Sequence, residues 1–154
     1  ALPVWAPEIL WNAENILAQL LLTTAIINFG DAPWAEPVLT IGQVDILSDG
    51  TYRLSTNSPA AIYRNLTFPE NIYEVNFTVN YANATVPSRL ELIFAGNVIW
   101  QQDVPDAALA TPSQVSVPLA ILAGQAGELR WELNNLTGTQ AVATIEDIKF
   151  KTVD

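Results

Sequence analysis

Residues 71–82, NIYEVNFTVNYA, set the expectation for the fold. Apolar and polar side chains alternate along this segment, and a period of two residues is typical of a β-strand with one buried face and one wet face. The side chains predicted to face inward are those of Tyr73, Val75, Phe77, Val79 and Tyr81. The segment therefore predicts a long, half-buried strand of an antiparallel sheet.

Segments with a similar pattern lie on both sides of this strand, and turn residues separate them at short intervals. They are residues 38–47, 51–55, 60–68, 88–95, 97–104, 113–120, 127–135 and 141–151. Long helical patterns are absent between them. This spacing predicts a mainly β domain over residues 38–154, an antiparallel jelly-roll-like β-sandwich of eight or nine strands.

The last of these strands breaks its own alternation at Glu146 and Asp147. Ile145 shares a face with Ile148 and Phe150 only if one residue is inserted between them, which predicts a β-bulge. A bulge that carries two carboxylates can direct them at a cation, and calcium prefers oxygen ligands. Glu146 and Asp147 are therefore candidate calcium ligands, and the alternative is two solvated acids at a kink.

The N-terminal residues 8–29, EILWNAENILAQLLLTTAIINF, have a different pattern. Their polar side chains recur at helical spacing in one narrow stripe, and nearly all the others are large and apolar. This predicts a hydrophobic α-helix that ends at Gly30, before Pro33. The expected organisation is a hydrophobic N-terminal segment (1–30), a linker (31–37) that contains Trp34, and the sandwich (38–154).

Such a helix needs to be covered, since each large apolar side chain gains roughly 1.5–3 kcal/mol on full burial. Its own domain, neighbouring subunits or a membrane could cover it, but the uncharged run 15–30 is short for a membrane span. We expect burial between copies of the chain, in a self-assembling structural subunit of a filament, tube or surface layer. The residues predicted to make these contacts are Trp5, Ile9, Trp11, Leu17, Leu20, Leu21 and Ile27.

The composition excludes several classes of function. The net charge is −10 with only six Lys and Arg residues. This excludes a nucleic-acid-binding surface and disfavours binding to a membrane of anionic lipids. The chain contains no Cys or His, so zinc fingers, thiol nucleophiles and His-based triads are impossible. Paired carboxylates are the remaining catalytic option, and because no pattern sets two of them across a cleft, we expect no enzyme.

Four N-x-Thr sequons suggest an exported glycoprotein, with N-linked glycans at Asn65, Asn76, Asn83 and Asn135. The alternative is a β-protein that is simply rich in Asn and Thr. The sequence starts without Met or a basic region before its apolar run. We therefore expect a secreted or cell-surface chain whose signal peptide has been removed.

Four segments of the chain occur in an order that is similar to that of a known group of domains. They are YEVNFTVNYA, RLELIFAGNVIW, SVPLAILAGQAGELRWELNN and ATIEDIKF. Their order resembles that of jelly-roll domains of extracellular bacterial and archaeal proteins, which include carbohydrate-binding modules and surface-anchored domains. In that group an Asp at the position of Asp147 often binds structural calcium. The helix followed by a β-sandwich is similar in architecture to archaeal pilins.

The resemblance implies an alternative to self-assembly, a carbohydrate-binding module that binds polysaccharide. Tyr52, Tyr63 and Trp100 are the aromatic side chains that would stack on a sugar, although Trp100 also fits a core position.

Overall fold

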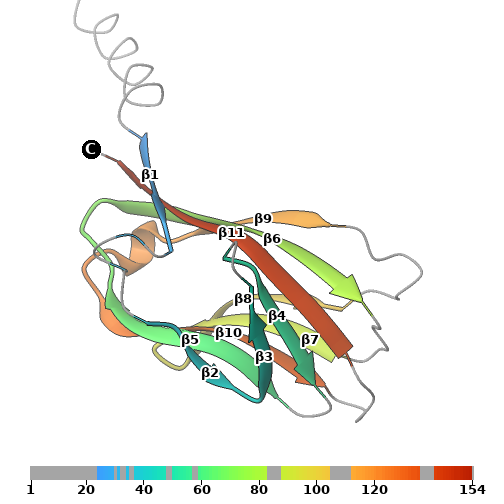
Figure 1. Ribbon diagram of the computed structural model, residues 1–154. Helices are drawn as coiled ribbons and strands as arrows, with labels where there is room; N and C mark the ends of the chain where they lie inside the picture. Colours follow the sequence, from blue (N-terminus) through green and yellow to red (C-terminus); the bar gives the residue numbers. More distant parts are fainter. Residues whose placement is uncertain are drawn as a thin grey trace, which may run out of the picture.

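The computed structural model describes residues 24–29, 31, 34, 37–47, 50–56, 59–82, 88–104, 112–135 and 141–153. Two antiparallel sheets pack face to face (Figure 1). Their strands are β1 (Thr24–Asn28), β2 (Leu39–Ile41), β3 (Gln43–Ile46), β4 (Tyr52–Thr56), β5 (Ala60–Thr67), β6 (Ile72–Ala82), β7 (Ser88–Phe94), β8 (Asn97–Asp103), β9 (Ser113–Pro118), β10 (Ala126–Asn135) and β11 (Ala141–Val153). A short 3-10 helix, Ala120–Leu122, precedes β10.

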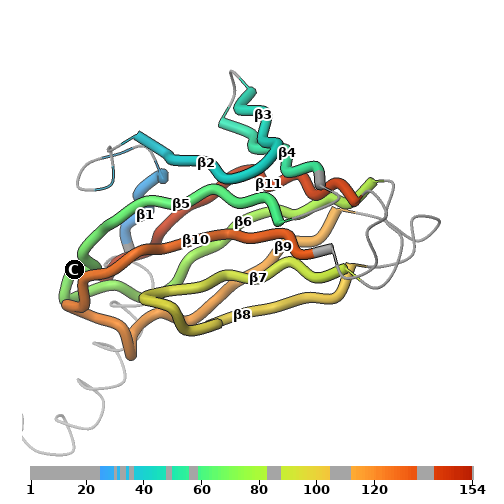
Figure 2. Tube along the Cα trace, turned by 90° about the horizontal axis from the view of Figure 1, so that it is seen from below, coloured from blue at the N-terminus to red at the C-terminus, as the bar shows by residue number. Residues whose placement is uncertain are grey.

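Sheet A has the order β3-β4-β11-β6-β9, with β1 also paired to β11, and sheet B has the order β2-β5-β10-β7-β8. Figure 2 shows β5, β10, β7 and β8 of sheet B side by side. The last eight strands, β4 to β11, are divided between the sheets in the order of a jelly roll. The predicted mainly β sandwich is confirmed, with eleven strands in the described residues instead of eight or nine.

Part of this difference arises at Gly42, where the single strand predicted over residues 38–47 is divided. Gly42 has a φ of +74°, and a Cβ added there would lie 2.5 Å from the carbonyl oxygen of Pro59. Only glycine fits this close approach without strain. The chain turns there from β2 in sheet B to β3 in sheet A.

The core between the sheets contains the residues that the alternation of β6 predicts, with one exception. Val75, Phe77, Val79 and Tyr81 are buried, but Tyr73 is 46 % exposed. The register between β6 and β11 shifts at this end of the strand, because Lys151 pairs with Glu74 and Thr152 pairs with Ile72. Tyr73 is the extra residue, so its side chain points outward and that of Ile72 is buried instead.

The β-bulge predicted in the last strand is confirmed. The register of β11 against β6 shifts between Glu146 and Lys149, and Asp147 has a left-handed φ of 56°. Beyond the bulge, Ile148 and Phe150 are buried, as Ile145 is before it. The inserted residue thus keeps both halves of β11 in phase with the core.

The predicted N-terminal helix is wrong over residues 24–28, which form strand β1. β1 pairs antiparallel with the second half of β11, from Thr24 opposite Val153 to Asn28 opposite Lys149. β-branched Ile26 and Ile27 suit a strand, and the pairing satisfies backbone groups along an edge of β11 that β4 does not reach. Residues 8–23 lie outside the described residues. The described residues include no helix long and apolar enough to cross a membrane.

Phe29, directly after β1, lies at the centre of an aromatic cluster. Its ring centroid is 5.4 Å from that of Trp131 and 5.8 Å from that of Phe150, and the guanidinium of Arg64 lies 3.9 Å from its ring. Trp34, from the predicted linker, is also buried, with its ring 4.2 Å from Phe150. Phe29 and Trp34 therefore belong to the sandwich core, and residues 24–28 belong to sheet A.

Replacing Phe29 by Ala should lower the free energy of unfolding by about 3–5 kcal/mol, because a large buried ring is removed from a packed cluster. Urea denaturation measures the change. The matched control is Ile26→Ala in β1, where the side chain is 58 % exposed and the expected loss is about 0.5 kcal/mol. Equal losses for the two variants would contradict the packing of Phe29.

Candidate functional site

The bulge of β11 lies in a break between two strands that share one edge. β4 pairs with Ala141–Ile145 and β1 pairs with Lys149–Val153, so residues 146–148 have no strand partner on that side. A cavity of about 410 Å³ opens there, and we call it the β1–β4 hollow. The residues that line it are Asn28, Phe29, Gly50, Tyr52, Asp147, Ile148 and Lys149.

Tyr52 supplies the half-buried aromatic ring of this hollow. Its ring meets that of Phe29 edge to face, with centroids 6.3 Å apart. Burial raises the pKa of the Tyr52 phenol, and the positive charge of Arg64 partly offsets the rise. The phenol is therefore neutral at physiological pH, and its hydroxyl can both donate and accept a hydrogen bond.

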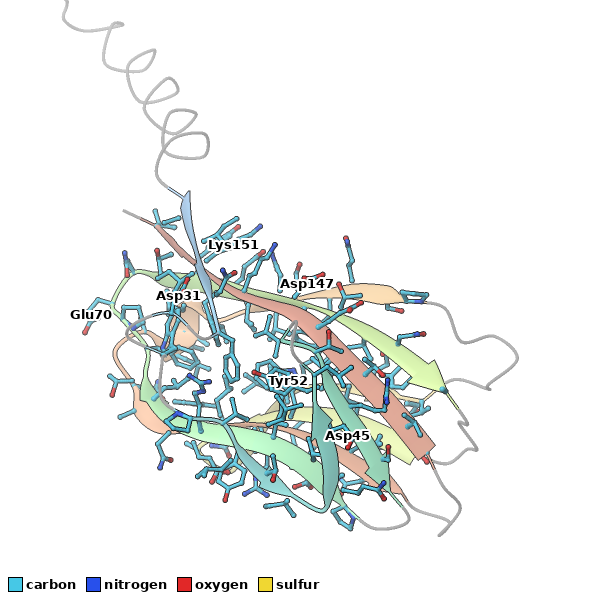
Figure 3. All side chains as sticks on the ribbon, in the orientation of Figure 1. Asp31, Asp45, Tyr52, Glu70, Asp147 and Lys151 are labelled. Atoms are coloured by element: carbon cyan, nitrogen blue, oxygen red, sulfur yellow. The ribbon has the colours of Figure 1, made fainter. Side chains whose placement is uncertain are left out.

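Asp147 and Lys149 give the hollow its two charges, and both side chains are exposed. Figure 3 shows Asp147 and Lys151 along the outer side of β11, with Tyr52 toward the space between the sheets. Within the described part of the chain, neither Asp147 nor Lys149 forms an ion pair. A carboxylate that accepts hydrogen bonds and an ammonium that donates them are thus both available to a ligand.

Glu146 and Asp147, the predicted calcium ligands, are joined by fewer acidic side chains than a calcium site normally has. Calcium binds six to eight oxygen atoms. The described residues contain no group of three or more Asp, Glu, His or Cys side chains that could hold a metal. The Thr51 hydroxyl lies 3.5 Å from Glu146 Oε2, and Lys149 lines the same hollow as Asp147. Calcium at Glu146 and Asp147 stays a prediction.

The other two candidate stacking residues do not join this hollow. Tyr63 is on sheet B, and the guanidinium of Arg130, itself paired with Glu128 and Glu132, lies 4.8 Å from its ring. Trp100 packs edge to face on the core residue Phe77, with centroids 5.2 Å apart. The structure therefore brings together Tyr52 and Asp147, while Trp100 belongs to the edge of the core.

The sequon asparagines differ in their surroundings. Asn65 is exposed on β5, whereas Asn76 on β6 is only partly exposed. The side chain of Asn135, at the end of β10, and the whole of Asn83 lie outside the described residues. Glycosylation at all four positions stays a prediction.

The predicted assembly residues Trp5, Ile9, Trp11, Leu17, Leu20 and Leu21 also lie outside the described residues. Ile27 is in β1, where it is half-buried and packs against the core of its own chain.

Of the seven residues that line the hollow, sequence reasoning names Tyr52 and Asp147 and misses the other five, Asn28, Phe29, Gly50, Ile148 and Lys149. The helical pattern of residues 8–29 predicts Asn28 and Phe29 in a helix, and it gives no sign that they lie beside the bulge. Lys149 follows Asp147 by two residues in a chain with very few cations, and that proximity was the available signal.

No family model matches the sequence, and no curated protein matches it either. Among solved structures, a mutant of CBM29-2, a family 29 carbohydrate-binding module complexed with cellulohexaose, is similar with a TM-score of 0.55 and 9 % identity, over 86 % of this chain and 94 % of that one. The CBM36-1 domain of a multidomain xylanase from the hindgut metagenome of Trinervitermes trinervoides is similar with a TM-score of 0.51 and 14 % identity, over 82 % and 95 %.

A family two carbohydrate esterase from Cellvibrio japonicus is matched over 85 % of this chain but 33 % of its own length, with 15 % identity and a TM-score of 0.42. At these identities the likeness concerns the fold alone. The resemblance to carbohydrate-binding modules is confirmed at that level, and none of these structures bears on the filament-subunit resemblance.

The left-handed backbone at Asp147 has a measurable consequence. Asp147→Val should lower the free energy of unfolding by about 1–2 kcal/mol, because a β-branched residue is strained at positive φ. Asp147→Asn should cost little, since Asn tolerates this conformation. Thermal or urea unfolding compares the two, with Asp45→Val in β3 as the control at an exposed strand position. An Asp147→Val variant as stable as the wild type would contradict the bulge geometry.

Proposed function

We propose that this chain is a carbohydrate-binding module and that the β1–β4 hollow holds a sugar unit. The observation that carries the proposal is the convergence of Tyr52, Asp147 and Lys149 on one cavity. Its volume of about 410 Å³ is within the roughly 300–1,000 Å³ range of small-molecule sites. The fold is similar to those of two carbohydrate-binding modules, one of them complexed with cellulohexaose.

The chemistry of the hollow suits a sugar. A pyranose ring has apolar C–H faces and a rim of hydroxyl groups, so it needs both an aromatic contact and polar partners. Tyr52 supplies the aromatic surface, Asp147 can accept hydrogen bonds from hydroxyls, and Asn28 and Lys149 can donate to them. Binding of this kind requires no acid–base chemistry, in keeping with a non-catalytic module.

This proposal takes precedence over self-assembly through the N-terminal segment. Ile27 and Phe29 pack within their own chain, so the apolar surface that motivated assembly is smaller by these two side chains. A polysaccharide ligand would have this module act outside the cell, which agrees with the four sequons.

Titration of the full chain against a panel of soluble polysaccharides and oligosaccharides, by calorimetry, tests the proposal. At least one glycan should bind, and Asp147→Asn should weaken it about tenfold, because a charged hydrogen-bond acceptor becomes neutral. Tyr52→Phe, which keeps the packing on Phe29, should also weaken binding through the lost hydroxyl.

The matched controls are Tyr63→Phe and Asp45→Asn, which make the same chemical changes at half-exposed or exposed positions outside the hollow. Both should bind like the wild type. Absence of binding across the panel, or equal losses in the controls, would rule out this site.

A further inference from the structure

A second cavity adjoins the first on the outer face of sheet A. It has a volume of about 280 Å³ and lies over β6, β9 and β11, and we call it the outer groove. Asp147 and Lys149 line both the outer groove and the β1–β4 hollow. A ligand that is longer than one sugar unit can therefore extend from one cavity into the other past these two side chains.

The outer groove contains both lysines of the chain, Lys149 and Lys151. This is notable in a protein with a net charge of −10. Lys151 Nζ lies 3.4 Å from a carboxylate oxygen of Glu74, which neutralises it. Lys149 is exposed and has no ion-pair partner in the part of the chain that the structure describes. The ammonium of Lys149 is thus available for an anionic group.

The groove also offers polar partners for hydroxyl groups. Asn76 Oδ1 is buried and accepts no hydrogen bond among the described residues. A buried acceptor without a donor costs about 1–3 kcal/mol, so a donor from outside the chain would stabilise it. Thr78, two residues along β6, and Ser116, which pairs with Asn76 across the sheet, also line the groove. The hydroxyls of Thr78 and Ser116 can exchange hydrogen bonds with the hydroxyls of a sugar in the groove.

We infer that the glycan bound by this module is acidic, and that a uronic acid carboxylate in the outer groove is bound by Lys149. This rests on the proposed function. A neutral sugar would need only hydroxyl and amide partners, whereas an ammonium forms a stronger, charge-assisted hydrogen bond with a carboxylate. Asp147 lines the same groove and opposes an anion there, whereas the exposed charges more than about 8 Å away are largely screened at physiological salt.

The test compares matched polysaccharides that differ in their carboxylates: polygalacturonate against its methyl ester, and glucuronoxylan against xylan without the acid branches. Affinity is measured by calorimetry on the full chain. One of the acidic polymers should bind about fivefold more tightly than its neutral counterpart, the ratio expected for one partly exposed ion pair.

Lys149→Gln should remove this preference and Lys149→Arg should retain it. The matched control is Arg53→Gln, which removes one positive charge from an exposed position of β4 outside both cavities and should leave the preference unchanged. A preference that survives Lys149→Gln overturns the inference. Equal affinity for acidic and neutral polymers, with binding still weakened about tenfold in Asp147→Asn, overturns the inference but leaves the proposed function. Absence of binding to every polymer overturns both.

Discussion

The insertion of Phe29 between the two sheets is the contact on which the rest of this structure depends. Its ring packs on Trp131 of sheet B and Phe150 of sheet A, under the guanidinium of Arg64. Its backbone N–H donates a hydrogen bond to the carbonyl of Ile148, at 3.1 Å, directly beside the bulge. Phe29 therefore fixes the end of β1 against β11, and β1 forms one wall of the hollow. Without this anchor the second half of β11 would be an open edge and the hollow would have no such wall.

Much of the sandwich could be predicted because the side chains on the buried face of a strand are every second residue, so the alternation of apolar and polar residues is visible in the local sequence. The alternation of β6 and the slip of phase at Glu146 and Asp147 gave a strand and a bulge that the structure confirms. Residues 24–28, at the end of the N-terminal apolar run, show no such alternation. A short, continuous apolar segment fits a buried helix or a strand equally well, and the pairing of β1 with β11 joins residues more than a hundred positions apart. The alternation predicts the wrong face for Tyr73 for a related reason, since the direction of its side chain depends on a register shift of β6 against β11.

The sequence predicts two residues of the candidate site, Tyr52 and Asp147, but not that they lie in one site. Asp147 was found through the bulge and Tyr52 through its residue type, but nothing joined the two. Asn28 and Lys149 form a cross-strand pair at the rim of the hollow, and that pair exists only once β1 is known to be a strand. The composition also gives no sign of the positive charge of Lys149 in the site. The net charge of −10 describes the whole chain, whereas the two lysines lie together on one face of sheet A. Because the residues of this site are brought together by the pairing of strands distant in sequence, they can be recognised as a site only when the fold is known.

Amide hydrogen exchange at Phe29 tests this account most directly. If Phe29 holds β1 to the bulge, its N–H should exchange only when the whole domain unfolds, with an opening free energy close to that of amides in the centre of β11. The amide of Gly50, which donates to the Leu47 carbonyl in an exposed turn, is the internal reference for local opening. Exchange at Phe29 as fast as at Gly50, while the centre of β11 stays protected, would contradict the central role of this residue.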